Sequence, residues 1–454
     1  MTPQYPNPLL LDLYELTMAQ SYFIYRRATL ATFDLFVREL PKNRAYLVAC
    51  GLEDVLNYIR NLRFSKEDLE YLKGRKIFSK DFLRYLSRFR FKGDIWAMPE
   101  GSIFFANEPV IRVTASIIEA QIIESFLLNT INLQTMIASK ASRVVLAAKG
   151  RGVYDFSLRR THGSDAGIKV GRASFIAGFS GTSCVLAGKL YRIPLIGTMA
   201  HSYVMSFKHE LDSFLAYANT FPGKTTLIVD TYNTKKGIEN AVRIGLYLKA
   251  IGHKMQGIRL DSGDIVSLSK LARKMLNQAA LSYVKIFASG NLDEFRIKNL
   301  LDEGVLADSF GVGTNMGVSI DAPCLDVVYK ISEVTGENGK FLPTMKLSRG
   351  KITYPSRKQV FRVLGARGDF IKDILGLDKE KIRGRPLLIK VVEKGRIIYK
   401  MPSLEKVRAF VRDSLSKITR DLKDIYFKVE YPVLISPQLK KIRHSLSSQL
   451  RRRQ

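Results

Sequence analysis

The feature that most constrains the fold is an alternation of short apolar runs and amphipathic stretches that begins near residue 151. The apolar runs have the length of buried strands and cover residues 152–156, 193–196, 226–230, 256–260, 284–288 and 308–311, with 327–331 as a candidate closing strand. Helical patterns separate most of them and cover residues 234–251, 264–278 and 293–303. Strands that alternate with helices are typical of a parallel sheet. The number of repeats favours a parallel α/β barrel over an open sheet.

Polar residues or glycine follow nearly every predicted strand. The segments are residues 159–162, 201, 230–233, 261–264, 289–291 and 311–315. Any one of them has the composition of an ordinary turn that caps a helix. Because the carboxyl ends of barrel strands meet on one rim, the whole series predicts a pocket there.

His201 stands among small residues in segment 197–202, directly after the apolar run 193–196. A lone loop histidine is usually a hydrogen-bonded structural residue. It is also the side chain that titrates near neutral pH, so at a strand end it is a candidate for chemistry.

The other polar segments carry the residue types that bind phosphorylated sugars. Glycine-rich turns after the last strands can point backbone N–H groups at an anion, and the candidates are Gly290, Asn291, Gly313 and Thr314. Arginines offer fork-shaped donors for phosphate or carboxylate, and the candidates are Arg159, Arg160 and Arg259. Three aspartates could bind sugar hydroxyls or a phosphate-bound Mg²⁺, namely Asp230, Asp261 and Asp264. We therefore expect a small phosphorylated sugar as substrate, together with a second anionic partner.

The chain is strongly basic, with 72 Lys and Arg against 42 Asp and Glu and a net charge of +30. Such an excess attracts polyanions, which include nucleic acid, acidic membranes and phosphorylated small molecules. The basic residues are scattered through most of the sequence, as on a solvated surface, and form no recognisable nucleic-acid motif. A nucleic-acid-binding protein that keeps an enzyme-like barrel is the alternative from another class.

The cysteines and the apolar stretches indicate a soluble, cytoplasmic protein. The three cysteines lie far apart and have no zinc-ligand spacing. The apolar stretch 117–128 contains Glu119, Gln121 and Glu124, which makes it too polar to cross a membrane. We expect no signal peptide and no membrane contact.

The length of 454 residues predicts two or three domains. Residues 1–130 are predicted to form an α+β domain, with a helix over 11–25 and a half-buried strand over 32–38. Residues 116–146 predict one or two long buried helices that lead into the barrel, which we place at 131–330. Residues 331–454 predict strands and a helix near 404–418, in a segment that packs with the N-terminal domain.

Several motifs together resemble those of nicotinate phosphoribosyltransferases. Residues 11–20 (LDLYELTMAQ) resemble the opening signature of that family, and residues 155–160 (DFSLRR) its first barrel strand. Residues 197–201 (GTMAH) resemble its histidine loop, and residues 257–264 (GIRLDSGD) its ribose loop. A C-terminal signature over 346–362 completes the series, so the resemblance spans nearly the whole chain.

The resemblance implies a type II phosphoribosyltransferase fold, with an irregular parallel α/β barrel beside an α+β domain built from the N- and C-terminal segments. It also implies a reaction. Nicotinate would displace pyrophosphate from 5-phosphoribosyl-1-pyrophosphate (PRPP), which gives nicotinate mononucleotide for NAD biosynthesis. ATP hydrolysis would drive the step through phosphohistidine at His201, so the enzyme would formally be a ligase. Mg²⁺ would bind through the substrate phosphates rather than in a firm protein site.

The resemblance also implies roles for individual residues. Phe156 and Tyr14 match positions that stack on the pyridine ring, with Tyr14 supplied by the second subunit of a homodimer. Arg259 is the candidate for the nicotinate carboxylate, and Arg159 for pyrophosphate or that carboxylate. Asp261 would hold ribose hydroxyls, and Asp230 would assist the histidine or the metal. The 5-phosphate is assigned to a set of four residues, Gly290, Asn291, Gly313 and Thr314.

Ser183 bears on the choice of pyridine substrate. Relatives specific for nicotinamide carry an acid near segment 181–184, and a carboxylate there would repel nicotinate at a cost on the order of a few kcal/mol. Serine at this position therefore favours nicotinate over nicotinamide. Nicotinamide or quinolinate phosphoribosyltransferase activity remains the closest alternative.

Overall fold

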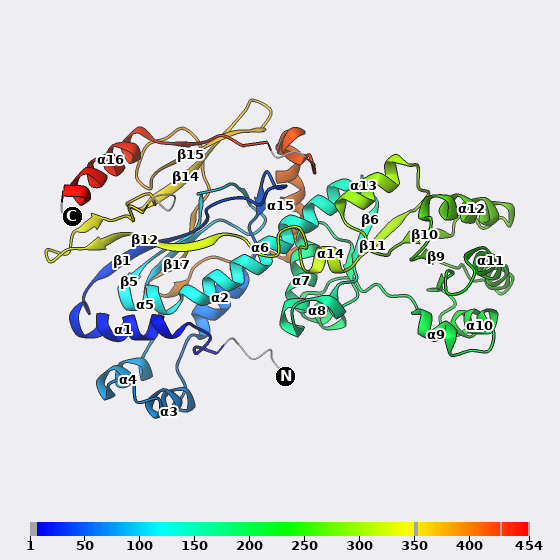
Figure 1. The fold of residues 1–454 in the computed structure, drawn as a ribbon, viewed down its shortest axis with the longest axis horizontal. Coiled ribbons are helices and arrows are strands. Elements are labelled where there is room, and N and C mark those ends of the chain that lie inside the picture. The colour runs from blue at the N-terminus through cyan, green and yellow to red at the C-terminus, as the bar shows by residue number, and fades with distance from the viewer. Residues whose placement is uncertain (1–6, 349–352, 427–428, 453–454) are drawn as a thin grey trace. The chain divides into compact units, whose positions relative to one another are not determined.

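Both ends of the chain build one of the two compact units of the computed structural model, which describes residues 7–348, 353–426 and 429–452 (Figure 1). The first unit comprises residues 1–136 and 324–454, and the second comprises residues 137–323. The first unit thus has the predicted mixture of helices and strands from both termini.

A seven-stranded sheet in the order β13-β12-β1-β5-β3-β17-β18 forms the centre of the first unit. Its strands are β1 (Leu30–Val37), β3 (Asp94–Ala97), β5 (Pro109–Ser116), β12 (Val327–Thr335), β13 (Phe341–Pro343), β17 (Ile389–Glu393) and β18 (Arg396–Ile397). A four-stranded sheet in the order β16-β14-β15-β19 and the small pair β2-β4 complete the strands of this unit. They are β2 (Leu47–Val48), β4 (Ile103–Phe104), β14 (Lys358–Leu364), β15 (Phe370–Leu377), β16 (Arg385–Pro386) and β19 (Val433–Ile435).

The helices of the first unit begin largely at hydroxyl caps. They are α1 (Leu13–Tyr25), α2 (Leu52–Asn61), α3 (Lys66–Gly74), α4 (Lys80–Ser87), α5 (Ile117–Ile122), α15 (Leu404–Lys417) and α16 (Pro437–Arg452). Ser65 and Asp68 form a capping box at α3, and the side chain of Ser79 caps α4. The long helix α6 (Glu124–Ala147) contains the division between the units and, with α5, confirms the helices predicted over 116–146.

The second unit is a curled parallel sheet with the order β7-β6-β11-β10-β9-β8, the half-barrel form of the predicted α/β barrel. Its strands are β6 (Gly152–Asp155), β7 (Gly181–Thr182), β8 (Thr226–Ile228), β9 (Gly257–Leu260), β10 (Lys285–Ala288) and β11 (Ser309–Val312). Its helices are α7 (Ser164–Ile176), α8 (Val185–Tyr191), α9 (His201–Met205), α10 (Glu210–Thr220), α11 (Thr234–Ala250), α12 (Ile265–Gln278), α13 (Glu294–Asp302) and α14 (Thr314–Gly317), with the 3₁₀ turn η1 (Leu158–Arg160). Fully buried side chains such as Ile258, Ile286 and Phe310 form the core of the sheet.

Two predicted barrel strands are wrong. Residues 193–196 form no strand, because Pro194 has no N–H to donate and Leu195 makes only an isolated bridge to Thr182, so β7 supplies the edge of the sheet. The predicted closing strand 327–331 lies in β12, which pairs antiparallel with β1 in the first unit. Its apolar run marks it as a strand but does not say which sheet it joins.

The strand predicted over 32–38 forms as β1, but it is not half-buried. Seven of its eight residues are buried, because β1 lies between β5 and β12 with both faces covered. Among the described residues, none of the helices combines the length and the hydropathy that a membrane crossing needs.

Candidate functional site

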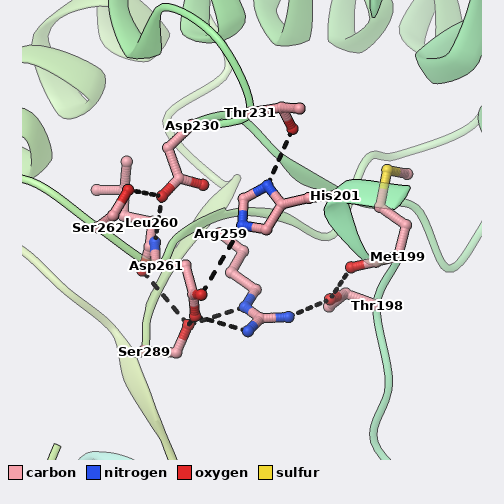
Figure 2. Close-up of polar contacts among 10 residues, drawn as sticks. All are labelled: Thr198, Met199, His201, Asp230, Thr231, Arg259, Leu260, Asp261, Ser262 and Ser289. Atoms are coloured by element: carbon pink, nitrogen blue, oxygen red, sulfur yellow. Dashed lines mark hydrogen bonds and ion pairs between the residues drawn. The ribbon is translucent and has the colours of Figure 1, made fainter. Parts of the chain in front are cut away.

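The carboxyl ends of β8, β9 and β10 bring one polar cluster together (Figure 2). Asp230 follows β8, Arg259 and Asp261 lie at the end of β9, and Ser289 follows β10. The strands are parallel and adjacent, so these ends meet at the same edge of the sheet, as the sequence predicted.

Arg259 is held in one orientation by three side chains. Its Nε donates to Ser289 Oγ at 2.8 Å, Nη1 donates to Thr198 Oγ1 at 3.2 Å and Nη2 donates to Asp261 Oδ1 at 2.6 Å. A guanidinium carries five N–H donors. Counting the contacts of the described residues, two of these donors remain for a ligand. Phe156 lies against the same group, with the guanidinium carbon 5.3 Å from its ring centroid.

Asp261 connects the arginine to the histidine. Its Oδ1 accepts from Arg259 and from Ser289 Oγ, at 2.6 and 2.5 Å. Partial burial pushes the pKa of Asp261 upward, but the Arg259 charge, these hydrogen bonds and the nearby His201 outweigh burial and bring the pKa below its usual value. The group is therefore a carboxylate at neutral pH.

Asp230 organises the backbone of the loop after β9. Its Oδ2 accepts from the backbone N–H of Asp261 at 3.0 Å and from Ser262 Oγ at 2.6 Å. Its Oδ1 is shielded from solvent and accepts no hydrogen bond within the described part of the chain. A shielded carboxylate oxygen of this kind is suited to a cation or a hydroxyl donor.

His201 is the first residue of α9 and faces the two aspartates (Figure 2). Its Nδ1 lies 3.1 Å from Thr231 Oγ1, and its Nε2 lies 3.9 Å from Asp261 Oδ2. The imidazole is 39% exposed, so Nε2 is accessible to a ligand. The ring is thus oriented through one nitrogen and presents the other.

The two predicted phosphate segments also meet. Asn315 Nδ2 donates to the backbone carbonyl of Asn291 at 3.2 Å, which ties the loop after β10 to the loop after β11. Gly290 has φ +94°, and a Cβ there would lie 2.0 Å from the carbonyl oxygen of Asp261. Gly313 and Thr314 begin α14 beside Phe156, with the position of a Gly313 Cβ 3.4 Å from the Phe156 carbonyl oxygen.

Asp155, the last residue of β6, is a buried acid at the same edge of the sheet. It is fully buried, and burial raises the pKa of its carboxyl group despite hydrogen bonds from Ser157 and Thr182. Ser183 follows β7, and its backbone N–H donates to the Asp155 carbonyl at 2.9 Å. Since Thr182 pairs with Asp155 in the parallel register, Ser183 comes next to Phe156 at the ends of neighbouring strands.

Three candidate residues from the sequence take no part in the cluster's hydrogen bonds and ion pairs. Arg159 is exposed in η1, and no hydrogen bond of the described residues joins it to the cluster. Tyr14 lies on α1 in the first unit, where burial followed by the charges of Glu124, Glu15 and Asp12 raises its pKa. Asp264 caps α12 through its Oδ1 and binds no member of the cluster.

Sequence reasoning overlooked the hydroxyl groups that orient the charged residues. Thr198 and Ser289 bind Arg259, and Thr231 binds His201. Thr231 and Ser289 stand in polar segments that follow predicted strands, and Thr198 stands in segment 197–202 beside His201, so their positions were a usable signal. Their partners depend on which loops meet in space.

Known proteins resemble this chain over nearly its whole length. Family models of nicotinate phosphoribosyltransferase match in chain order: the N-terminal domain over residues 9–132, the family's main model over 152–363 and the C-terminal domain over 381–443. A nicotinate phosphoribosyltransferase of Mycobacterium tuberculosis is 45% identical, over 97% of this chain and 95% of that protein. The chain belongs to the nicotinate phosphoribosyltransferase family.

Other family members extend the likeness to another bacterium and to a solved structure. The nicotinate phosphoribosyltransferase of Bacillus subtilis is 38% identical over 94% of this chain and 92% of its own length. The crystal structure of human nicotinic acid phosphoribosyltransferase superposes with a TM-score of 0.87 at 28% identity, over 96% of this chain and 99% of that chain. The protein is accordingly an enzyme of the nicotinate phosphoribosyltransferase kind, and the cluster around His201 is its candidate active site.

Proposed function

We propose that the enzyme transfers the phosphoribosyl group of PRPP to the ring nitrogen of nicotinate, with ATP hydrolysis coupled through His201. The observation that carries the coupling is the orientation of His201, whose Nδ1 lies 3.1 Å from Thr231 Oγ1 while Nε2 is presented toward Asp261. When Thr231 accepts the proton of Nδ1, Nε2 keeps its lone pair and can attack the terminal phosphorus of ATP. The new N–P bond forms as the bond to the ADP oxygen breaks, and ADP leaves.

Transfer itself needs alignment and charge more than a base. The nitrogen of nicotinate already carries the lone pair that attacks C1 of the ribose, and pyrophosphate leaves with the electrons of the C–O bond. The transition state is a ribose with oxocarbenium character, which nearby carboxylates stabilise. Asp261, whose pKa is held low, and Asp230 supply negative charge for this purpose.

The arginine and the aromatic ring at the end of β6 and β9 suit nicotinate. Arg259 keeps two N–H donors beyond its three side-chain partners, enough for a carboxylate, and Phe156 lies against its guanidinium. We assign the 5-phosphate to the joined loops that contain Asn291 and Gly313. Arg159, exposed on η1, is assigned to pyrophosphate or to the nicotinate carboxylate.

Mg²⁺ would reach the site on the phosphates of PRPP and ATP. The shielded Oδ1 of Asp230, which has no hydrogen-bond partner among the described residues, and Oδ2 of Asp261 fit the oxygen ligands that Mg²⁺ prefers. When bound, the ion neutralises charge on the leaving pyrophosphate.

We further propose a homodimer in which Tyr14 of one chain enters the site of a second copy, and NAD biosynthesis in the cytoplasm as the setting. Tyr14 is 46% exposed, and Leu10 and Leu13 beside it are each 55% exposed, so this segment presents apolar surface for a partner. The molar mass in solution, measured by light scattering, should be that of two chains.

The experiment that tests the coupling compares His201→Ala with His209→Ala. His209 lies eight residues along the chain, is exposed, and serves as matched control. The purified protein should form nicotinate mononucleotide from nicotinate, PRPP and Mg²⁺, faster with ATP, and should carry an acid-labile phosphate. His201→Ala should lose the ATP effect and the phosphate but keep some transfer, whereas His209→Ala should keep both.

Two results would contradict the proposal at different points. Unchanged ATP stimulation in His201→Ala would remove the histidine assignment and leave the transferase. Failure of the parent protein to use nicotinate, nicotinamide or quinolinate, together with salt-sensitive binding of DNA or RNA, would favour the nucleic-acid alternative.

A further inference from the structure

The first unit contains a pocket of its own, made by residues that take no part in the His201 cluster. Its volume is about 130 Å³, and its walls come from β4, β14 to β17 and α15. Much of the lining is apolar, with Ile103, Phe370 and Leu387 buried and Phe410 half-buried. An apolar cavity of roughly 150 Å³ holds one benzene ring, so this pocket is close to the size of a single six-membered ring.

Two arginines face each other at this pocket. Arg362 on β14 is directly opposite Arg385 on β16 in the antiparallel register, and both line the pocket. Side chains in such a pair lie close together, and like charges directly opposite each other are destabilising. Arg385 is exposed, so water screens part of this repulsion, and an anion bound nearby would offset the rest.

Protein carboxylates meet this need for only one of the two arginines. Arg362 is 4% exposed, and its Nε donates to both oxygens of Asp373, at 2.9 and 3.2 Å. Glu108 adds no compensating charge, because its complete burial, followed by the nearby Asp373, raises its pKa well above the usual value. Arg385 forms no ion pair with any described residue.

The third cation of the pocket is already paired. Nζ of Lys417 on α15 lies 2.6 Å from Oδ2 of Asp413, and both residues line the pocket. With Arg362 matched by Asp373 and Lys417 by Asp413, the positive charge of Arg385 is left over. The pocket thus combines an apolar interior with one unmatched positive charge.

We propose that this pocket binds a small organic monoanion, with its carboxylate beside Arg385 and Arg362 and an apolar body of about one ring against Phe370 and Phe410. Such a ligand supplies the charge that the arginine pair lacks and fills the apolar space. The site does not depend on the proposed function of the His201 cluster.

The test is calorimetric titration of the full chain with cyclohexanecarboxylate, a saturated ring that is unsuited to aromatic stacking on Phe156. One molecule should bind per chain, and cyclohexanecarboxamide, which lacks the charge, should not bind. Arg385→Gln should weaken binding at least about tenfold. Arg383→Gln removes the same charge two residues away from an exposed position outside the lining, and should stay within about twofold of the parent.

A second variant guards against a folding defect. Leu364 lines the pocket and is 43% exposed, so a charged side chain can replace it. The carboxylate of Leu364→Glu should repel the anion and weaken binding as much as Arg385→Gln does. Thermal unfolding of each variant should match the parent. The proposal is overturned by an absence of binding at about 10 mM ligand, by equal losses in Arg383→Gln and Arg385→Gln, or by a loss in Arg259→Gln that places the ligand in the other unit.

Discussion

Nε2 of His201 lies 3.9 Å from Oδ2 of Asp261, while the other oxygen of that carboxylate is occupied by Arg259. The distance is too long for a hydrogen bond but short enough for a charge to be felt. Asp261 therefore faces the arginine proposed for nicotinate with one oxygen and the histidine proposed for phosphate with the other. A single carboxylate thus lies between the groups proposed for phosphoribosyl transfer and for the ATP step.

Asp261→Asn should lower activity without disturbing the fold. Asparagine keeps the shape but loses the charge that faces Arg259 and His201, so kcat/KM for PRPP should fall about 100-fold. Asp264→Asn is the matched control, since Asp264 caps α12 in the same loop and asparagine caps equally well. Steady-state kinetics with and without ATP give the measurement, and equal losses in the two variants would contradict the role of Asp261.

Arg259→Lys should show whether geometry or charge matters at the arginine. Lysine cannot reproduce the directed bonds to Ser289, Thr198 and Asp261, so the charge persists without its orientation. We expect kcat/KM for nicotinate to fall about 10- to 100-fold with little change in the KM for PRPP. Arg243→Lys, an exposed position on α11, should have no effect. A rise confined to the PRPP KM would assign Arg259 to a different substrate.

Gly290→Ala should disrupt the contact between two strand ends. The backbone there has φ +94°, and the added methyl would lie 2.0 Å from the Asp261 carbonyl oxygen, so the loop must move. We expect a loss of stability of about 2 kcal/mol and a larger loss of activity. Gly223→Ala, where nothing lies within 4 Å of the added Cβ, is the control. Urea unfolding of both variants decides the matter.

Ser183→Asp should change the preference between pyridine substrates. Ser183 stands next to Phe156 at the ends of β7 and β6, so a carboxylate there would meet the substituent of a ring stacked on Phe156. Repulsion on the order of a few kcal/mol should lower kcat/KM for nicotinate while nicotinamide is spared or gains. Parallel assays of both pyridines measure the ratio, and an unchanged ratio would place the substituent elsewhere.

The sequence allowed much of this site to be predicted, because parallel strands bring their carboxyl ends together. That rule alone grouped Asp230, Asp261 and the segment with Ser289. It could not supply hydroxyl partners such as Thr198, since those depend on which loops meet. The apolar run 327–331 likewise identified β12 as a strand without showing that hydrogen bonds to β1 place it in the other sheet. Local patterns fix element type, whereas pairing is decided by contacts distant in sequence.

Glu15 should make the stability of the protein depend on pH. It is buried on α1 beside Ser125, and burial together with the charges of Glu124 and Asp12 raises the pKa of Glu15 to about 8. Since this value lies above that of the unfolded chain, neutral Glu15 contributes its full stability below about pH 4.5, and the contribution is lost as pH rises through about 8. The free energy of unfolding, measured in urea at a series of pH values, should therefore decline across this window.

Glu15→Gln, which mimics the neutral form, should flatten the decline, whereas Glu67→Gln at an exposed position on α3 should preserve it. An equal slope in the parent and in Glu15→Gln would show that another group is responsible.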